Sequence, residues 1–471
     1  MRGGLERWKR GVASEGVHQA VGYAFDGSCD ATHRSILPGV ENAVRYSGSG
    51  TGSVVRFAVS AEGIEQSLLS AGGLSRWVDG ADPATGVRRG RELSSPDADL
   101  LLDATMNMPK SFSLAVLLTP ELRADLEMLQ DRIRDRTLRL WHSELNARRG
   151  AGGLIREPIA RLEVVELRHE RSRALDPHLH RHLWLGVKVL GQDGKWSNVD
   201  SRVAMKLHTV VNAEGDLASR TDPDWLAALA RHGYTLDGKG EIAELAHLVR
   251  PLSRRSNQIE ANRALRLADW RRSHPGQQPD HATLAWIDRW AWARSRPGKP
   301  DVVDEAAWET VIRAEIAALD PSAMDRREPA TLVGRRLADL DRDLLAAIAI
   351  ADADRRSAGS GGRFSRYDIR AGVIRALASS GIVADRSVLD EAMEDVTVRA
   401  QEQTVDFLSA EVTVPAHVKH LMSLPTAQAK LDLAACFEQL TSTGELVHDE
   451  TVRRIARERL GDATTMDVAQ I

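Results

Sequence analysis

The chain has 471 residues, 42% of them hydrophobic, which is enough for two or three domains with well-buried cores. Two cysteines, Cys29 and Cys436, cannot form a disulfide framework, no apolar run approaches the length of a membrane span, and the N-terminus shows no apolar signal segment. These features exclude a disulfide-rich secreted domain and a protein with membrane-spanning helices, so we expect a cytoplasmic protein without membrane insertion.

The formal net charge of −4 hides an uneven distribution. The first 300 residues carry a net positive charge and the remainder carries a net negative charge. The most basic stretch is 251–300, where Trp270, Trp286, Trp290 and Trp292 are interleaved with arginines. Basic side chains neutralise phosphates and aromatic rings stack on bases, so this mixture favours a single-stranded nucleic-acid ligand. A solvated helical face with core tryptophans is the alternative.

The hydrophobic pattern predicts a mixture of helices and strands up to about residue 245, followed by mostly helical chain. In chain order we expect a helix at 16–25, a buried strand at 100–106 whose apolar run continues over 112–118, a helix at 120–147, a strand at 161–169, helices at 198–217 and 224–232, and a turn-linked strand pair at 234–245. Serine and glycine at 357–362 indicate a probable linker.

Three histidines are the most informative feature of the chain. Alternate residues of a strand share one face, so His180 and His182 point together, opposite to leucines such as Leu183. If 174–177 forms the turn of a hairpin, His169 on the preceding strand lies across from His180 or His182. Neutral imidazoles that leave positions open for water or substrate suit a catalytic metal site better than a structural one. We therefore predict that His169, His180 and His182 bind one divalent metal ion.

His178 shares the same strand face but does not fit this site. Residues two apart on a strand are separated by about 6.6 Å, so His178 and His182 would lie roughly 13 Å apart. Zinc ligands, in contrast, sit about 2.0 to 2.1 Å from the ion. The identity of the ion stays open between Mn, Mg, Zn and Ni, although magnesium alone would prefer oxygen ligands.

The segment from Arg168-His169 through Ser172-Arg173-Ala174-Leu175-Asp176-Pro177-His178-Leu179-His180-Arg181-His182 resembles the metal motif of TrwC/TraI-type conjugative relaxases, the MobF branch of the HUH endonucleases. A second segment agrees, because Leu102-Asp103-Ala104-Thr105 and Met108-Pro109-Lys110-Ser111-Phe112-Ser113 look like that family's Asp-Leu-Thr and Pro-Lys-Ser-x-Ser signatures. A looser third segment, Ala20-Val21-Gly22-Tyr23 with Asp26-Gly27 and Asp30, is similar to the family's nucleophile helix.

The resemblance implies a role for several residues. Tyr23 would be the catalytic nucleophile, and Asp103 would be a catalytic acidic residue that orients a metal histidine or assists proton transfer. A helix packed over the histidine face of the sheet would place Tyr23 above the scissile phosphate. Lys110 and Arg173 would contact DNA.

The chain also departs from the family pattern. Many members carry two pairs of tyrosines in the nucleophile helix, whereas Tyr23 stands alone and Ala31 and Thr32 occupy the positions of the second pair. This puts a second strand-transfer tyrosine in doubt and leaves Tyr46 as a reserve candidate. We expect none of these 471 residues to form the family's usual helicase, and 363–400 resembles at most the helical connector that precedes it.

The resemblance implies an α+β fold in which an antiparallel HUH-type relaxase sheet carries helices on one face and the DNA groove on the other. We expect a relaxase domain at 1–300 and a mainly helical C-terminal region at 301–471. The implied function is metal-dependent nicking and rejoining of single-stranded DNA at a transfer origin through a covalent 5′-phosphotyrosine, which initiates conjugation. A separate helicase and transfer-machinery proteins would be partners.

Three other functions stay open at this stage. A rolling-circle replication initiator would use the same chemistry, a non-catalytic DNA-binding module could keep the metal site, and a generic three-histidine metallohydrolase would need no tyrosine. The presence or absence of a tyrosyl-DNA adduct separates the last two from a relaxase.

Overall fold

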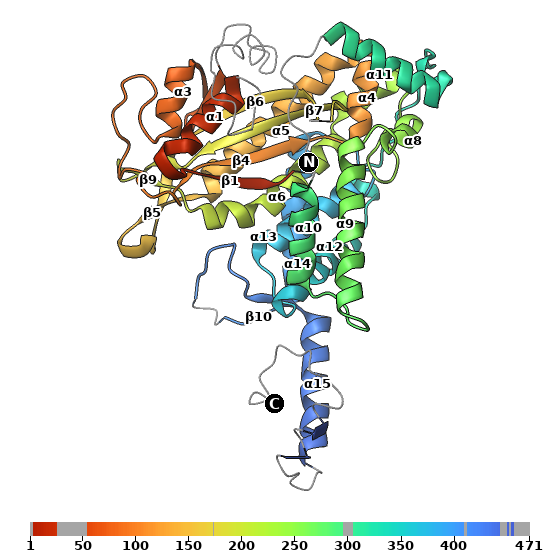
Figure 1. Cartoon of the computed structure of the whole chain (residues 1–471). Helices are drawn as coiled ribbons and strands as arrows, with labels where there is room; N and C mark the ends of the chain where they lie inside the picture. Colours follow the sequence, from red (N-terminus) through yellow and green to blue (C-terminus); the bar gives the residue numbers. More distant parts are fainter. Residues whose placement is uncertain are drawn as a thin grey trace.

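The fold is built around an antiparallel sheet that is followed by a helical C-terminal region (Figure 1). The computed structural model describes residues 3–25, 54–172, 174–294, 305–408, 412–442, 450–451 and 454–455. Cys29, Ala31, Thr32, Tyr46 and Arg173 lie outside these residues.

The central sheet follows the order β1-β4-β7-β6-β2-β3, and each of its described ladders is antiparallel. Two short additions extend it, because β5 and β8 both pair with β6, and β9 pairs with β8. The strands are β1 (Leu5–Lys9), β2 (Val54–Ser60), β3 (Gly63–Leu69), β4 (Asp99–Asn107), β5 (Asn146–Arg149), β6 (Ile155–Arg171), β7 (Pro177–Gly186), β8 (Lys188–Gly191) and β9 (Trp196–Asn198). The predicted antiparallel sheet is thus confirmed.

The two strands that carry the histidines form the predicted hairpin. His169 of β6 pairs directly with His180 of β7, and β7 also pairs with β4 on its other side, where Thr105 lies opposite His182. Side chains alternate between the two faces, so Leu183 is fully buried on the face opposite to the histidines. The register therefore gathers all three histidines on one face of the sheet.

Helices cover both faces of this sheet. On the histidine face lie α1 (Glu15–Phe25), whose Tyr23 contacts Trp184, and α3 (Ala71–Val78), whose Trp77 indole donates to Glu163 at 2.9 Å. On the opposite face α4 (Lys110–Leu118) packs against β7, and α5 (Arg123–Glu144) packs against β6. The helix expected over the histidine face is thus present as α1, and its apolar side, including Val17 and Val21, is buried.

Three predicted elements differ from the structure. The apolar run at 112–118 does not continue the strand but belongs to α4, which begins directly after Pro109. The helix expected to reach Ala147 ends at Glu144, and Ala147 lies in β5. The strand pair at 234–245 is reduced to a single bridge between Leu236 and Ile242.

Within the basic stretch, α9 (Arg254–Ser273) and α10 (His281–Ala293) form a helical hairpin and pack against each other (Figure 1). Few of its side chains are buried: α9 has none, and Ile287 and Ala291 are the fully buried ones in α10. Between β9 and this hairpin the chain forms α6 (Ser201–Thr221), α7 (Pro223–Arg231) and α8 (Ala246–Val249). Most of the hairpin surface is therefore available to a ligand.

The C-terminal region packs against the sheet-bearing part of the chain. α13 lies against α6, and the Arg386 guanidinium donates to Glu214 of α6 at 2.7 Å. The elements of this region are α11 (Glu305–Leu319), α12 (Arg342–Arg356), α13 (Arg366–Ala378), α14 (Arg386–Glu402), β10 (Thr404–Asp406), β11 (Leu421–Ser423) and α15 (Leu424–Ser442). α15 extends away from the rest of the molecule (Figure 1).

The probable linker at 357–362 is a compact turn between α12 and α13, which pack against each other. Its first residue, Ser357, is buried and donates to the Asp354 carbonyl at 2.7 Å. Within the described ranges, no helix has the length and apolar character needed to cross a membrane.

Candidate metal and nucleophile site

The three predicted metal ligands meet at one point of the sheet. His169, His180 and His182 each offer a ring nitrogen, and these nitrogens all lie within 4.8 Å of one another. The ring centroids of His169 lie 5.0 Å from His180 and 4.9 Å from His182. Three imidazoles this close can converge on one ion, because each ligand nitrogen would need to be about 2.0 to 2.1 Å from it.

The hydrogen bonds of two histidines favour the tautomer that a metal needs. The Nδ1 of His182 lies 2.8 Å from Asp103 Oδ1 and 3.0 Å from Oδ2, and the Nδ1 of His180 lies 2.7 Å from the carbonyl oxygen of His178. Both partners accept hydrogen bonds, so each Nδ1 carries the proton and each Nε2 carries the lone pair. This arrangement, in which an acceptor fixes a ligating imidazole, is typical of metal sites. The donor set therefore fits a divalent ion.

His178 lies beside the three histidines without joining them. Its ring stacks on that of His180 at 4.6 Å between centroids, and its Nε2 lies 3.2 Å from Asn107 Oδ1. Burial lowers the pKa of His178 to about 3, helped by the positive charge of Lys110. His178 is therefore a neutral imidazole that hydrogen-bonds Asn107 and packs against the His180 ring.

Tyr23 lies directly over the histidine cluster. Its phenol oxygen is 3.1 Å from His182 Nε2, and its ring lies 5.5 Å from the His169 ring. Trp8 of β1 contacts the Tyr23 ring edge to face at 5.5 Å, and Trp184 of β7 lies 5.7 Å from it. The tyrosine is 5% exposed and is held by aromatic neighbours, so its oxygen has a defined position beside the nitrogens.

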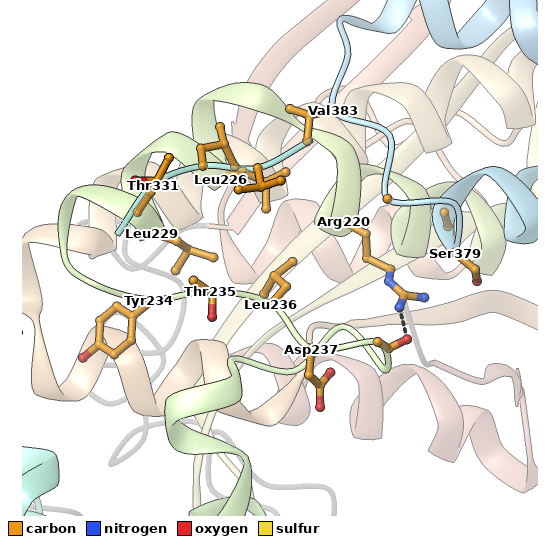
Figure 2. Close-up of a pocket in the computed structure, with 16 residues that line it drawn as sticks. Arg220, Leu226, Leu229, Tyr234, Thr235, Leu236, Asp237, Thr331, Ser379 and Val383 are labelled. Carbon is orange, nitrogen blue, oxygen red and sulfur yellow. Dashed lines mark hydrogen bonds between the residues drawn. The ribbon is translucent and has the colours of Figure 1, made fainter. Parts of the chain in front are cut away.

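The two other tyrosines that the structure describes lie elsewhere. Tyr234 is buried, with its hydroxyl 3.0 Å from Thr119 Oγ1, and it borders a separate cavity of about 400 Å³ (Figure 2). Arg220 also lines that cavity, and its guanidinium donates to the Gly238 carbonyl oxygen. Tyr367 is buried and donates to Glu144 at 3.1 Å, and burial raises its pKa. Of the described tyrosines, Tyr23 alone adjoins the histidines.

Arg181, between the two strand histidines, points to the opposite face of the sheet. Its side chain is 1% exposed and donates to Glu166 Oε1 at 2.8 Å, to Gln130 Oε1 at 3.1 Å and to Asp131. Glu166 comes from β6, and Gln130 and Asp131 come from α5. The buried guanidinium thus ties the histidine-bearing strand β7 to its neighbours, a role that the sequence did not suggest.

Lys110 stands at the start of α4, where its positive charge acts on the His178 ring and interacts with the Asp176 carboxylate. Burial lowers the pKa of Lys110 to about 8, although the Asp176 carboxylate opposes this shift. The neighbouring serines of its motif support backbone: Ser113 Oγ accepts from the Leu179 N–H at 2.9 Å, and Ser111 Oγ accepts from the Ile242 N–H at 2.8 Å. Ser113 therefore anchors β7, and Ser111 anchors the loop that contains Ile242.

A cleft of about 700 Å³ opens beside Tyr23. Tyr23, Asp103 and His182 line one part of it, β1 and the first turns of α1 line another, and Trp292 of α10 lines the cleft as well. Sequence reasoning missed Asn107 and Trp8 as neighbours of the site. The two-residue period from Asp103 through Thr105 to Asn107 was the available signal for Asn107, because it places all three side chains on the histidine face.

Comparison with known proteins places the chain in a family. Residues 40–319 match the family model described as TrwC relaxase. No curated protein sequence matches the chain. Similar solved structures include the conjugative relaxase TrwC in complex with OriT DNA in a metal-free form, with 20% identity over 68% of this chain and 99% of that chain and a TM-score of 0.48.

Two further structures are similar over the same share of this chain. TrwC complexed with a 27-mer DNA comprising the recognition hairpin and the cleavage site has 21% identity, 98% coverage of that chain and a TM-score of 0.49. A metal-bound TrwC complex with OriT DNA has 20% identity, 98% coverage and a TM-score of 0.48. Because the family model matches more than half of the residues, this chain belongs to the TrwC relaxase family and is a DNA relaxase.

Proposed function

We propose that this relaxase cleaves and rejoins one strand of DNA at a transfer origin with Tyr23 as its nucleophile and His169, His180 and His182 as its metal ligands. The observation that carries the proposal is the 3.1 Å distance between the Tyr23 oxygen and His182 Nε2 at the convergence of the three histidines. A phosphate bound at this convergence would be next to the phenol oxygen.

A divalent ion bound by the three imidazoles would offset the negative charge on a non-bridging phosphate oxygen and orient the scissile phosphate. Mn, Mg, Zn and Ni are all candidates, although imidazole ligands favour the transition metals and zinc over magnesium. Asp103 acts through His182, since its carboxylate accepts a hydrogen bond from the Nδ1–H group and holds the ring in place. It is therefore a positioning residue.

In the cleavage step the Tyr23 oxygen forms a bond to phosphorus while the bond from phosphorus to the leaving 3′ oxygen breaks. The phenol loses its proton, and the released 3′ hydroxyl gains one. The product is a 5′-phosphotyrosine ester, which conserves the energy of the broken bond. Attack by a 3′ hydroxyl in the reverse direction then restores the strand without ATP.

The α9–α10 hairpin supplies a DNA-binding surface next to this site. Its arginines give it positive charge, so it suits the phosphates of a single strand that leaves the cleft. Lys110, at the start of α4, and Arg173 are proposed DNA contacts. A separate helicase and transfer-machinery proteins would complete the reaction in the cell.

Cleavage of single-stranded oligonucleotides in the presence of manganese tests the proposal. Wild-type protein should form a protein–DNA adduct that survives denaturant, and Tyr23→Phe should bind DNA without forming it. Tyr234→Phe is a matched control, because that hydroxyl is buried away from the site. Full cleavage by Tyr23→Phe would overturn the assignment.

A further inference from the structure

The wall of the cleft includes one indole that comes from outside the sheet and α1. Trp292, near the end of α10, lines the same cleft as Tyr23, Asp103 and His182. The residue is 40% exposed, which distinguishes it from the fully buried Trp184 beneath Tyr23. An indole this exposed is not explained by core packing.

The position of Trp292 is linked to the metal-binding hairpin. The Arg255 guanidinium donates to the Trp292 carbonyl oxygen, and the adjacent Arg254 donates to Asp176 Oδ1 at 3.1 Å. Asp176 is 1% exposed and lies in the turn between β6 and β7, where its backbone carbonyl accepts from the Ser172 N–H at 3.0 Å. The end of α10 is therefore fixed relative to the strands that carry the three histidines.

A second indole on α10 provides a contrast. Trp286 is also 40% exposed, but the Arg266 guanidinium lies 4.5 Å from its ring centroid, and Trp286 does not line the cleft. Arg266 also lies 5.5 Å from the Trp290 ring. Of these two equally exposed indoles, Trp292 is the one that lines the cleft beside Tyr23.

We propose that Trp292 is a stacking platform for the base of a nucleotide that adjoins the scissile phosphate. This inference rests on the proposed function, since it assumes that the scissile phosphate lies at Tyr23 and the three histidines. A strand whose phosphate occupies that point must place a neighbouring base in the cleft. An indole accepts any base by stacking, so Trp292 fixes the path of the strand without reading its sequence.

The test compares Trp292→Ala, Trp292→Phe and the matched control Trp286→Ala in the full chain. A single-stranded 20-mer of deoxythymidine is the binding probe, with the melting temperature of each variant as the folding control. Trp292→Ala should bind roughly 5- to 150-fold more weakly, the range expected for loss of one stacked base. Trp292→Phe and Trp286→Ala should remain within a few-fold of the wild type.

A second arm locates the stacked base. Oligonucleotides that the wild type cleaves are remade with one abasic site at each position near the cut. An abasic site at one of these positions should slow cleavage by the wild type. The same abasic site should not slow cleavage by Trp292→Ala any further, because that variant has already lost the stacking contact. The inference would be overturned if each abasic site slowed cleavage equally in the wild type and in Trp292→Ala. It would also be overturned if Trp292→Ala bound the 20-mer with wild-type affinity.

The two arms also separate this inference from the proposed function. Absence of a tyrosyl adduct in the wild type contradicts the nucleophile, while the affinity of Trp292→Ala for the deoxythymidine 20-mer still decides the stacking role. Adduct formation with unchanged affinity contradicts the stacking role alone.

Discussion

At the scale of single residues, the proposed metal ligands follow from the alternation of side chains on a strand and from strand pairing. His180 and His182 share a strand face, and His169 pairs with His180 across the hairpin, as the sequence predicted. The alternation of side chains on a strand needs no tertiary information, so these positions could be found without a structure. The contact between Asp103 and His182 could not be derived from spacing, because it depends on the pairing of β4 with β7.

Single alanine variants of the four clustered histidines test the ligand set. His169→Ala, His180→Ala and His182→Ala should each lose most of the bound metal, because two imidazoles remain. His178→Ala is the matched control and should keep its metal, since its Nε2 is directed to Asn107. Metal analysis of the purified variants gives the answer, and metal loss confined to His178→Ala would contradict the assignment.

Arg181 offers a prediction about stability. Arg181→Met should lower the free energy of unfolding by about 3–5 kcal/mol, because Glu166 would keep a buried charge without its main partner. The double variant Arg181→Met with Glu166→Met should recover much of this loss, since it removes both charges. Denaturant unfolding measures both effects. A single variant within about 1 kcal/mol of the wild type would show that Arg168, Arg134 or water compensates Glu166.

At the scale of elements, the local hydrophobic pattern predicted helices and strands correctly where one face of the element is apolar. The helix at 16–25 and the strand at 100–106 were placed nearly as α1 and β4 are observed. Local pattern failed at 112–118, because a short buried helix and a buried strand have equally continuous apolar runs. It also could not show that α10 brings Trp292 to the cleft, since that contact joins distant parts of the chain.

The position of α1 next to the end of β1 depends on Gly16. A Cβ atom on Gly16 would lie 1.9 Å from the Lys9 carbonyl oxygen and 2.9 Å from that of Arg10, so Gly16→Ala must shift the helix away from β1. The displacement should move Tyr23 and slow cleavage on the order of 100-fold, because in-line attack tolerates little misplacement. Metal content should persist, as the histidines lie on strands.

Gly359→Ala is the matched control for this substitution, because a Cβ atom there would meet nothing within 4 Å. Single-turnover cleavage of an oligonucleotide compares the two variants. Wild-type cleavage by a folded Gly16→Ala protein would show that the position of α1 does not limit the reaction.

At the scale of the whole molecule, the division into a relaxase domain and a C-terminal region stays a prediction. The first helix beyond residue 300 contacts the site's supporting elements. Trp308 of α11 donates to the Leu175 carbonyl at 2.9 Å, and Arg313 donates to the Leu117 carbonyl of α4. A fragment that ends at residue 300 lacks both contacts, whereas one that ends at residue 319 retains them.

We therefore expect a 1–319 fragment to cleave oligonucleotides at a rate within several-fold of the full chain, and a 1–300 fragment to be less stable. Cleavage and thermal unfolding of both fragments check this expectation. DNA binding by the 1–319 fragment should weaken as salt increases, because phosphate neutralisation releases counterions. A folded 1–319 fragment without cleavage would place an essential part of the site beyond α11.

The most direct test of the account is the chemical identity of the residue that becomes joined to DNA. The adduct formed by the wild-type chain with single-stranded oligonucleotide and manganese is digested with protease, and the DNA-bearing peptide is identified by mass spectrometry. The account predicts one modified peptide, with a 5′ phosphate on Tyr23. DNA attached to Tyr46, Tyr234 or Tyr367 would contradict it.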